Sequence, residues 1–414
     1  MINLRIIEIS PLLLLLSMAT AFTNLHASDF GAMVVPSLMD SNMDGWYKTP
    51  PNSGPNIHRA HSIYQDQEFN LLIFFRGYKA DQDNIVHVRY DVQIYDPQEK
   101  KTDDEGSDLL AYKGPMGNPN ALMLNQQYLK IVFTEKYPIG NYKIKVTAYD
   151  KINNKSFTSE TPIELVPFSL PDKFSSQKEA GEWMMKYYIS PTPIKAISAL
   201  QEFVQVDPVW LNENISILSF FKTIYEDNPF LLKNVDKQFS SFSKEDQKKF
   251  LIISSIIGDT QFLLKDISSL PNDLSDYLLE IADFRIPKVK DEIISAVQLD
   301  ILWSEFLATG KYEPIRKIVS SLALYKHKGT LDKIKSGEIK KVTEDIKAKA
   351  YLEATYQSAI WSLKSNMKQM PLVLKYCTFI YQNEKLDENI KRQLGTIIQV
   401  VQSEIREHDA SKDP

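Results

Sequence analysis

The sequence predicts an α+β protein with an N-terminal β-sandwich domain followed by an all-α domain. Apolar and polar residues alternate with a period of two between residues 28 and 168, which is typical of half-buried strands. From residue 176 to 406 the apolar residues follow the helical period instead. Between the two halves, Pro167 and Pro171 end the strand pattern, so we place a linker at residues 169–175.

Five short runs carry the strand pattern, at residues 69–75, 86–95, 129–133, 142–149 and 157–166. In the fourth run the apolar residues alternate with Lys and Thr, which predicts one core face and one wet face. The turn-forming residues 150–155 predict a hairpin with the last run. The pattern is that of an immunoglobulin-like sandwich, although the Cys-Trp-Cys core signature of such domains is missing.

The second half predicts roughly ten to thirteen helices arranged as irregular stacked hairpins. Ser176 and Glu179 form a capping box at the first of them. Further helix starts are predicted at Ser243, Pro287, Thr330 and Thr343, and helix ends at Gly258, Gly310, Gly329 and Gly337. Residues 299–321 predict a helical hairpin that turns at Gly310. No period typical of a regular solenoid recurs along this half.

The first 27 residues have the layout of a cleavable secretory signal. Arg5 precedes an apolar block at residues 11–22, and Ala27 is a small residue at the expected cleavage position, with an earlier alternative at Ala21. The block is shorter than the roughly 20 residues needed to cross a bilayer, so cleavage is favoured over anchoring. We therefore expect an exported protein, periplasmic or extracellular, without a transmembrane anchor and with a polar tail at residues 407–414.

The composition weighs against two further features. A formal net charge of −5 and a pI near 5.8 argue against binding to nucleic acid, which needs clustered Lys and Arg. The basic stretch 333–341 is interrupted by Glu338 and predicts a solvated helix face. Cys377 is the one cysteine of the chain, so no intramolecular disulfide forms and stability must come from packing.

Three aromatic phrases in the second half resemble those of an uncharacterised group of exported bacterial proteins with an aromatic-rich helical C-terminal domain. The phrases are WMMKYY at 183–188, LWSEFLATG at 302–310 and WSLKSN at 361–366. The resemblance implies export and a helical architecture. It implies no activity, and it assigns no residue a role.

The closest match to a ligand motif is a calcium-loop pattern formed by Asp40, Asn42 and Asp44, with Gly45 at the turn position. The bidentate glutamate expected at position twelve is absent, because Pro51 stands there. The alternative is an Asx-rich turn before the first strands. Two further acidic segments, 81–84 and 103–108, are expected to be solvated hairpin tips, or else to converge at one end of the sandwich and supply more oxygen ligands.

His58, His61 and His87 raise the alternative of a zinc or copper site in the first domain. In an extended segment, however, His58 and His61 point to opposite faces, so they share a metal only within a turn. Cys377 raises the alternative of a nucleophile. Its predicted helix places Val373 and Ile380 on the same face, which predicts a buried structural thiol.

No nucleophile elbow, phosphate-binding loop or dinucleotide-binding motif is present. We therefore expect a non-enzymatic binding or scaffolding protein of the cell envelope, without a cofactor, whose helical domain presents a surface to a protein partner. The alternative is an envelope hydrolase or carbohydrate-active enzyme with a site between the domains and the sandwich as an accessory binding module. The aromatic clusters at 183–188, 220–221 and 376–381 are predicted to be core.

Overall fold

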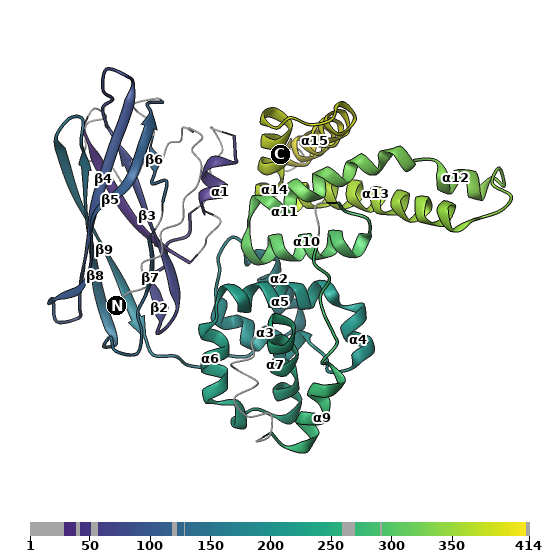
Figure 1. Cartoon of the computed structure of the whole chain (residues 1–414), viewed down its shortest axis with the longest axis horizontal. Helices are drawn as coiled ribbons and strands as arrows, with labels where there is room; N and C mark the ends of the chain where they lie inside the picture. The colour runs from purple at the N-terminus through teal and green to yellow at the C-terminus, as the bar shows by residue number, and fades with distance from the viewer. Residues whose placement is uncertain are drawn as a thin grey trace. The chain divides into compact units, whose positions relative to one another are not determined.

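A computed structural model describes residues 29–38, 42–50, 57–117, 122–127, 129–258, 270–289 and 292–410 (Figure 1). The chain is α+β, with two β-sheets in its N-terminal part and helices from Gln177 onward. It divides into two compact units. Unit 1 is Met1–Pro171 with Ile189–Ile194 and Asn228–Asn234, and unit 2 is the remainder from Asp172. The predicted signal peptide, residues 1–27, lies outside the described residues.

Unit 1 contains two sheets of different topology. In the first, β3 (Glu68–Arg76) pairs antiparallel with β1 (Gly31–Ser37), β6 (Met123–Leu124) and β7 (Leu129–Val132). The second has the order β2-β9-β8-β4-β5, formed by Ser62–Tyr64, Lys155–Val166, Gly140–Asp150, Ile85–Tyr95 and Lys101–Pro115. Its pairs are antiparallel except for β2 with β9, which is parallel.

The two sheets contribute to one hydrophobic core. In β8 the buried residues alternate with partly exposed ones, as the sequence predicts, and Ile144 and Val146 are fully buried. They belong to the same cluster as Ile73 and Phe75 of the other sheet. The predicted hairpin is confirmed, because β8 and β9 pair antiparallel around the turn at 151–154.

Strand β3 is buried on both faces, because a short helix covers the face that points away from this core. Helix α1 (Asn42–Tyr47) places Trp46 against Phe74, with ring centroids 5.1 Å apart. The hydroxyl of Tyr47 donates to the carbonyl of Leu124 at 2.9 Å. The sequence predicts an Asx-rich turn here as the alternative to a calcium loop, and residues 42–47 are helical instead. The apolar surface of Trp46 and Tyr47 is buried by forming a helix that packs on the sheet.

Residues 103–108 are also corrected by the structure. They were expected to be a hairpin tip, but they lie inside β5, which pairs with β4 through three register shifts. Residues 101–108, the first half of β5, are almost entirely polar and mostly exposed, whereas Ala111 and Tyr112 in its second half are buried in the core of unit 1. An apolar period therefore does not reveal this strand.

Unit 2 is built mainly from helices. The helices from Gln177 onward are α2 (Gln177–Lys186), α3 (Ala196–Phe203), α4 (Pro208–Glu213), α5 (Ile215–Asp227), α6 (Phe230–Lys237), α7 (Lys244–Ile257), α9 (Asn272–Glu280), α10 (Ala296–Thr309), α11 (Tyr312–Ser320), α12 (Thr330–Lys335), α13 (Glu344–Gln369), α14 (Pro371–Asn383) and α15 (Glu388–Ala410). All of them belong to unit 2, except that the first residues of α6 fall in unit 1. Short 3₁₀ turns occur at Pro193–Lys195, Phe239–Ser241 and Ser321–His327. No helix in the described ranges combines the length and apolarity needed to span a membrane.

Most predicted helix ends are confirmed. The hydroxyls of Ser243 and Thr343 cap α7 and α13, and Gly258 and Gly310 end α7 and α10 in the left-handed conformation. The start predicted at Pro287 is wrong, because the next helix begins only at Ala296. Its signal is a capping box in which Ser295 and Gln298 satisfy each other's backbone N–H groups.

Candidate functional site

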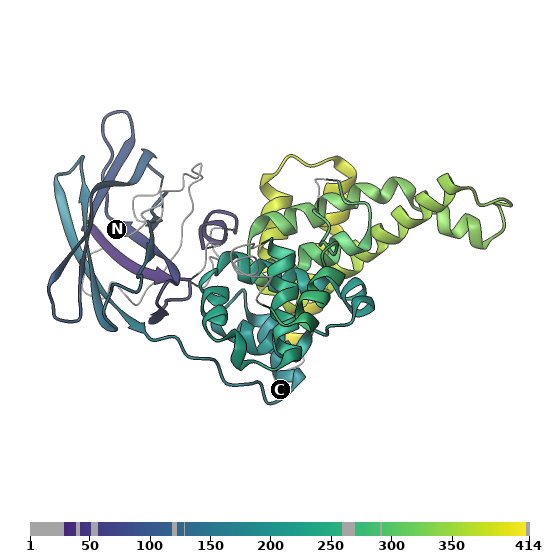
Figure 2. The same cartoon turned by 60° about the horizontal axis from the view of Figure 1, so that its bottom comes forward.

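The best candidate for an interaction surface is the hairpin of α12 and α13 in unit 2. Figures 1 and 2 both show α12 and the adjoining part of α13 extending away from the other helices of this unit. Gly329 and Gly337, both with positive φ, bracket α12, and Thr343 then caps the start of α13. The two glycines allow the sharp turns that fold this segment back along α13.

One face of α13 presents two large aromatic side chains to solvent. Tyr351 and Trp361 are each 73% exposed. A spacing of three or four residues places them on one stripe of the helix with the small residues between and beside them, Ala354, Ser358 and Ser365. We call these five residues the aromatic stripe. The opposite face carries the buried residues, among them Tyr356, Ala359 and Leu363. Burial of the stripe therefore requires a partner.

The loop side of the hairpin is positively charged. Between Lys326 and Lys349 there are eight lysines and four acidic residues, in a chain whose formal net charge is −5. Lys347 and Lys349 form ion pairs with Glu344 and Asp345, both at 2.7 Å. The other six lysines form no ion pair with a residue that the structure describes. The hairpin is thus a local positive region on an acidic protein.

Buried and bridging contacts fix the hairpin. The carboxylate of Glu353, which is 1% exposed, accepts from the backbone N–H groups of Gly329 at 2.9 Å and Leu331 at 2.8 Å. Burial alone would raise the pKa of Glu353, but backbone N–H groups outweigh it and hold the pKa below its usual value. Further contacts join α13 to α15. Tyr356 donates to Gln393, and Lys364 and Lys368 both bind Glu404.

The predicted calcium-loop residues are placed only in part. Asp40 lies outside the described residues, whereas Asn42 and Asp44 belong to α1. A calcium loop takes its ligands from alternate residues of a non-helical turn, whereas residues 42–47 are helical, so the backbone here is not that of a calcium loop. Calcium binding by this segment stays a prediction, and a calorimetric titration of the wild type against Asp44→Asn decides it.

The two acidic segments do not converge. Ile85 pairs with Pro115 and Tyr95 with Lys101, so residues 81–84 and 103–108 lie toward opposite ends of the β4–β5 ladder. The side chain of Asp81 accepts from the N–H groups of Asp83 and Ile85, as in an ordinary Asx turn. The alternative in which these segments complete one ligand set is therefore contradicted by the register of the sheet.

The three histidines His58, His61 and His87 contact different residues. His58 is exposed and lies 3.1 Å from the hydroxyl of Ser190, while His61 is exposed beside β9. His87 pairs with Lys113 across β4 and β5, and burial, with nearby cations, lowers its pKa. Within the described ranges, no group of three or more His, Cys, Asp or Glu side chains is arranged to hold a metal ion.

Cys377 lies on α14 and is fully buried. Burial raises the pKa of its thiol well above the usual value, so the thiolate is disfavoured. These observations agree with the structural interpretation of this residue. The aromatic clusters agree with their core interpretation at Phe220, Phe221 and Tyr376, all of them buried.

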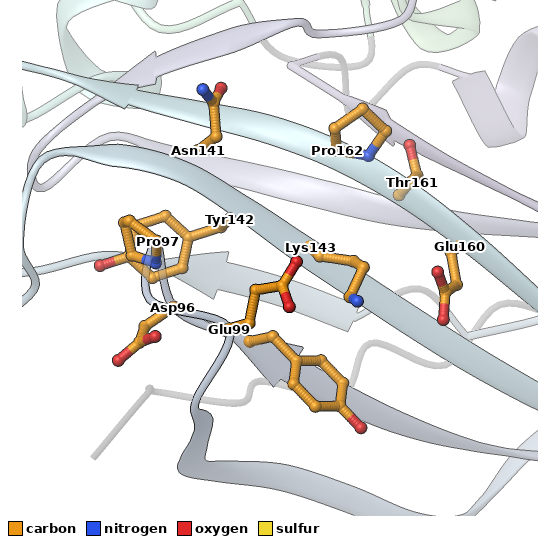
Figure 3. Close-up of a pocket in the computed structure, with 10 residues that line it drawn as sticks. Asp96, Pro97, Glu99, Asn141, Tyr142, Lys143, Glu160, Thr161 and Pro162 are labelled. Atoms are coloured by element: carbon orange, nitrogen blue, oxygen red, sulfur yellow. The ribbon is translucent and has the colours of Figure 1, made fainter.

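A shallow hollow of about 350 Å³ lies on the second sheet of unit 1 (Figure 3). It is formed where the turn after β4, with Asp96 and Pro97, lies beside Lys143 of β8 and Thr161 of β9. The carboxylate of Asp96 already accepts from the N–H groups of Gln98 and Lys100. The ammonium of Lys143 lies 5.0 Å from the ring centre of Tyr95. These side chains serve the turn and the sheet, and we assign the hollow no ligand.

Sequence reasoning missed the aromatic stripe. In the sequence, Trp361 belongs to the aromatic phrase WSLKSN, which by itself does not predict its exposure. A usable signal was present, since its neighbours at positions three and four residues away are Ser358, Lys364 and Ser365, which form a polar face. A tryptophan on a polar helix face indicates an exposed aromatic residue.

Comparison with known proteins gives no family. No family model matches the chain, and no curated protein matches it. Among solved structures, it is similar to a family 123 glycoside hydrolase from Clostridium perfringens, with 10% identity over 41% of this chain and 34% of that chain and a TM-score of 0.23.

A CARDB domain from Pyrococcus furiosus is 10% identical over 33% of this chain and 88% of its own length, with a TM-score of 0.15. The native α2-macroglobulin of Escherichia coli is 11% identical over 84% of this chain and 25% of that chain, with a TM-score of 0.19. The chain therefore spans about a third of the glycoside hydrolase. Likenesses this weak support no assignment of function.

Proposed function

We propose that this protein is an exported, non-enzymatic binding or scaffolding protein, and that the α12–α13 hairpin is its protein-interaction surface. Export is supported by the apolar block at residues 11–22 behind Arg5. The observation that carries the binding proposal is the aromatic stripe, in which Tyr351 and Trp361 are both 73% exposed. Tryptophan and tyrosine dominate the energetic centres of protein interfaces.

The charge of the hairpin defines the partner. Six lysines without an ion pair among the described residues lie before α12, within it and in the turn that follows it, so an acidic protein surface is attracted to this region over a distance. The small residues Ala354 and Ser358 lie beside the aromatic rings and let a partner backbone approach the helix closely. We therefore propose a partner with an apolar groove for the two rings and an acidic rim for the lysines. Acidic residues interspersed among the lysines suit a protein surface better than a uniformly anionic membrane.

Site-specific photocrosslinking in the full chain tests this proposal. A photoreactive phenylalanine analogue is placed at Trp361 and, as a matched control, at Leu279 of α9, which is 74% exposed on another helix. We expect one defined crosslinked protein from position 361 and none from 279. The yield falls with salt and with Lys340→Glu/Lys341→Glu, because both weaken the positive field. Equal products from both positions, or a 361 product insensitive to these charges, would contradict the proposal.

We further propose that unit 1 is an immunoglobulin-like sandwich and that unit 2 is an irregular stack of helical hairpins. Support for the first comes from two sheets that share one core cluster and are mostly antiparallel. The α10–α11 pair, which turns at Gly310, supports the second. An experimental structure of each unit, compared with known domains by strand order, tests both statements.

A further inference from the structure

A cleft of about 920 Å³ lies within unit 2, away from the aromatic stripe in sequence. One face of α5 and one face of α10 line it, with residues spaced three or four apart on each helix. Among its side chains are Lys222, Glu226 and Asp227 of α5, and Ile301, Leu302 and Glu305 of α10. The end of α7, the segment 285–289 and two lysines of the α11 region complete the lining. Its volume is that of a small-molecule site.

Glu305 is the unusual group of this cleft. It is partly buried, and burial raises the pKa of its carboxyl although Lys311 and Lys317 act in the opposite direction. Its backbone carbonyl accepts from Thr309, but its carboxylate forms no hydrogen bond or ion pair with any residue in the described ranges. Partial desolvation disfavours the charged form of Glu305, and a ligand that brings a cationic donor to this carboxylate offsets that cost.

The other charges of the cleft fall into two groups. Lys222 is paired with Glu226 at 2.6 Å, Lys311 approaches Asp227 at 4.0 Å, and Lys317 also has an interaction partner. Arg285 and Lys288, by contrast, are exposed, and neither forms an ion pair among the residues described. One guanidinium nitrogen of Arg285 donates to the carbonyls of Ala282 and Phe284, both at 2.7 Å. These bonds fix the guanidinium and leave its other nitrogens available to an anion.

The cleft therefore offers an unpaired carboxylate, two exposed cations and an apolar wall. Glu305 is partly buried, whereas Arg285 and Lys288 are exposed. The apolar wall is formed by Ile256, Ile257, Ile301 and Leu302. A simple anion would leave Glu305 unpaired, and a simple amine would leave the two cations without a partner.

We infer that this cleft binds a short peptide with free ends. The ammonium group of the peptide pairs with Glu305, its terminal carboxylate is held by Arg285 and Lys288, and an apolar side chain packs on the isoleucine wall. This site is separate from the α12–α13 hairpin, so its test stands or falls independently of the proposed partner protein.

Calorimetric titration of the full chain with the tripeptide Ala-Leu-Ala tests the inference. We expect binding of the free peptide, weakened roughly tenfold or more by N-acetylation, by C-terminal amidation, and by Glu305→Gln, because each removes a charge-assisted contact. In Glu305→Gln, acetylation should cause no further loss. Arg285→Ala/Lys288→Ala should abolish the difference between the acid and amide forms. Glu213→Gln, an exposed glutamate on α4 outside the cleft, is the matched control and should bind as wild type.

Folding of the variants is checked by thermal unfolding. Glu305→Gln should unfold no earlier than wild type, because a neutral amide is less costly to bury than a carboxylate. Three results overturn the inference: no heat with the free peptide at millimolar concentration, equal affinity for the acetylated peptide in wild type, or inorganic phosphate binding equally well to wild type and Glu305→Gln while the peptide does not bind.

Discussion

Glu353 of α13 accepts a hydrogen bond from the backbone N–H of Gly329 at 2.9 Å, across 24 residues of sequence. The same carboxylate accepts from Leu331, so a single buried side chain satisfies N–H groups that the start of α12 leaves without a helical partner. The orientation of the hairpin thus depends on one anion. No local side-chain cap replaces it, because the residue before α12 is a glycine.

We predict that Glu353→Gln destabilises the hairpin by about 1.5–3 kcal/mol, the range of charge-assisted hydrogen bonds. The amide keeps one acceptor but turns a donor toward a backbone N–H. Hydrogen exchange at residues 329–335 should become faster, while exchange in α5 and α10 stays unchanged. Uniform acceleration over all of unit 2 would show that the carboxylate supports more than the hairpin.

The contribution of Glu353 should also depend on pH. Its pKa in the folded protein lies below the ordinary 4.5, so its stabilisation is fully present above that value and is lost as pH falls through the folded pKa. The difference in unfolding free energy between wild type and Glu353→Gln should therefore be constant above about pH 5 and shrink below about pH 4. Denaturant unfolding at several pH values measures it, and a constant difference down to pH 3 would contradict the prediction.

Two glycines with similar φ should respond differently to alanine. At Gly77 (φ +68) an added Cβ would lie 2.1 Å from the carbonyl oxygen of Asp29, whereas at Gly258 (φ +75) it would meet nothing within 4 Å. Gly258→Ala should cost about 1–2 kcal/mol from the left-handed backbone alone. Gly77→Ala should cost more than about 3 kcal/mol, because backbone must also move. Urea unfolding compares them, and equal losses would refute the steric argument.

Cys377 should be inert in the native state. Its thiol is fully buried with a raised pKa, so iodoacetamide should label it only after unfolding. Cys377→Ala should cost about 1–2 kcal/mol, and Cys377→Ser about as much or more, since a buried hydroxyl needs a partner. Fast labelling of the folded protein would show that the packing around α14 opens.

Removal of Trp361 should separate binding from stability. Trp361→Ala is expected to change the unfolding free energy by less than about 0.5 kcal/mol, because the side chain is 73% exposed. Phe220→Ala, which empties a buried position of α5, should cost about 3–5 kcal/mol. Thermal and urea unfolding test both. A large loss from Trp361→Ala would mean that the ring packs within the protein and is not held ready for a partner.

The sequence correctly predicts the elements that have one buried face and one solvent-exposed face. Strand β8 is predicted by the alternation of apolar and polar residues, and helices α7 and α13 are predicted by their capping residues Ser243 and Thr343. Strand β5 is not predicted, because its first half, residues 101–108, is almost entirely polar and shows no apolar alternation. Helix α1 is not predicted, because Asp and Asn beside a glycine are typical of a loop. The helix is explained only by the tertiary contact of Trp46 with β3.

The candidate sites were less predictable than the fold. The exposure of Trp361 depends on which face of α13 packs on α14 and α15, and that is decided by tertiary contacts such as the Glu404 bridge to Lys364. The cleft around Glu305 is assembled from segments between residues 219 and 317, none of which has a motif of its own. Charged residues in such a pattern look like an ordinary solvated surface until the chain is folded.

Strand β5 is an edge strand of its sheet, with register shifts against β4 and acidic residues along its first half. Irregular spacing and repeated negative charge make such an edge a poor template for another chain. We therefore expect β5 to disfavour edge-to-edge pairing with a second chain, and straightening the strand or neutralising its acidic half should create an aggregation hazard without touching the core.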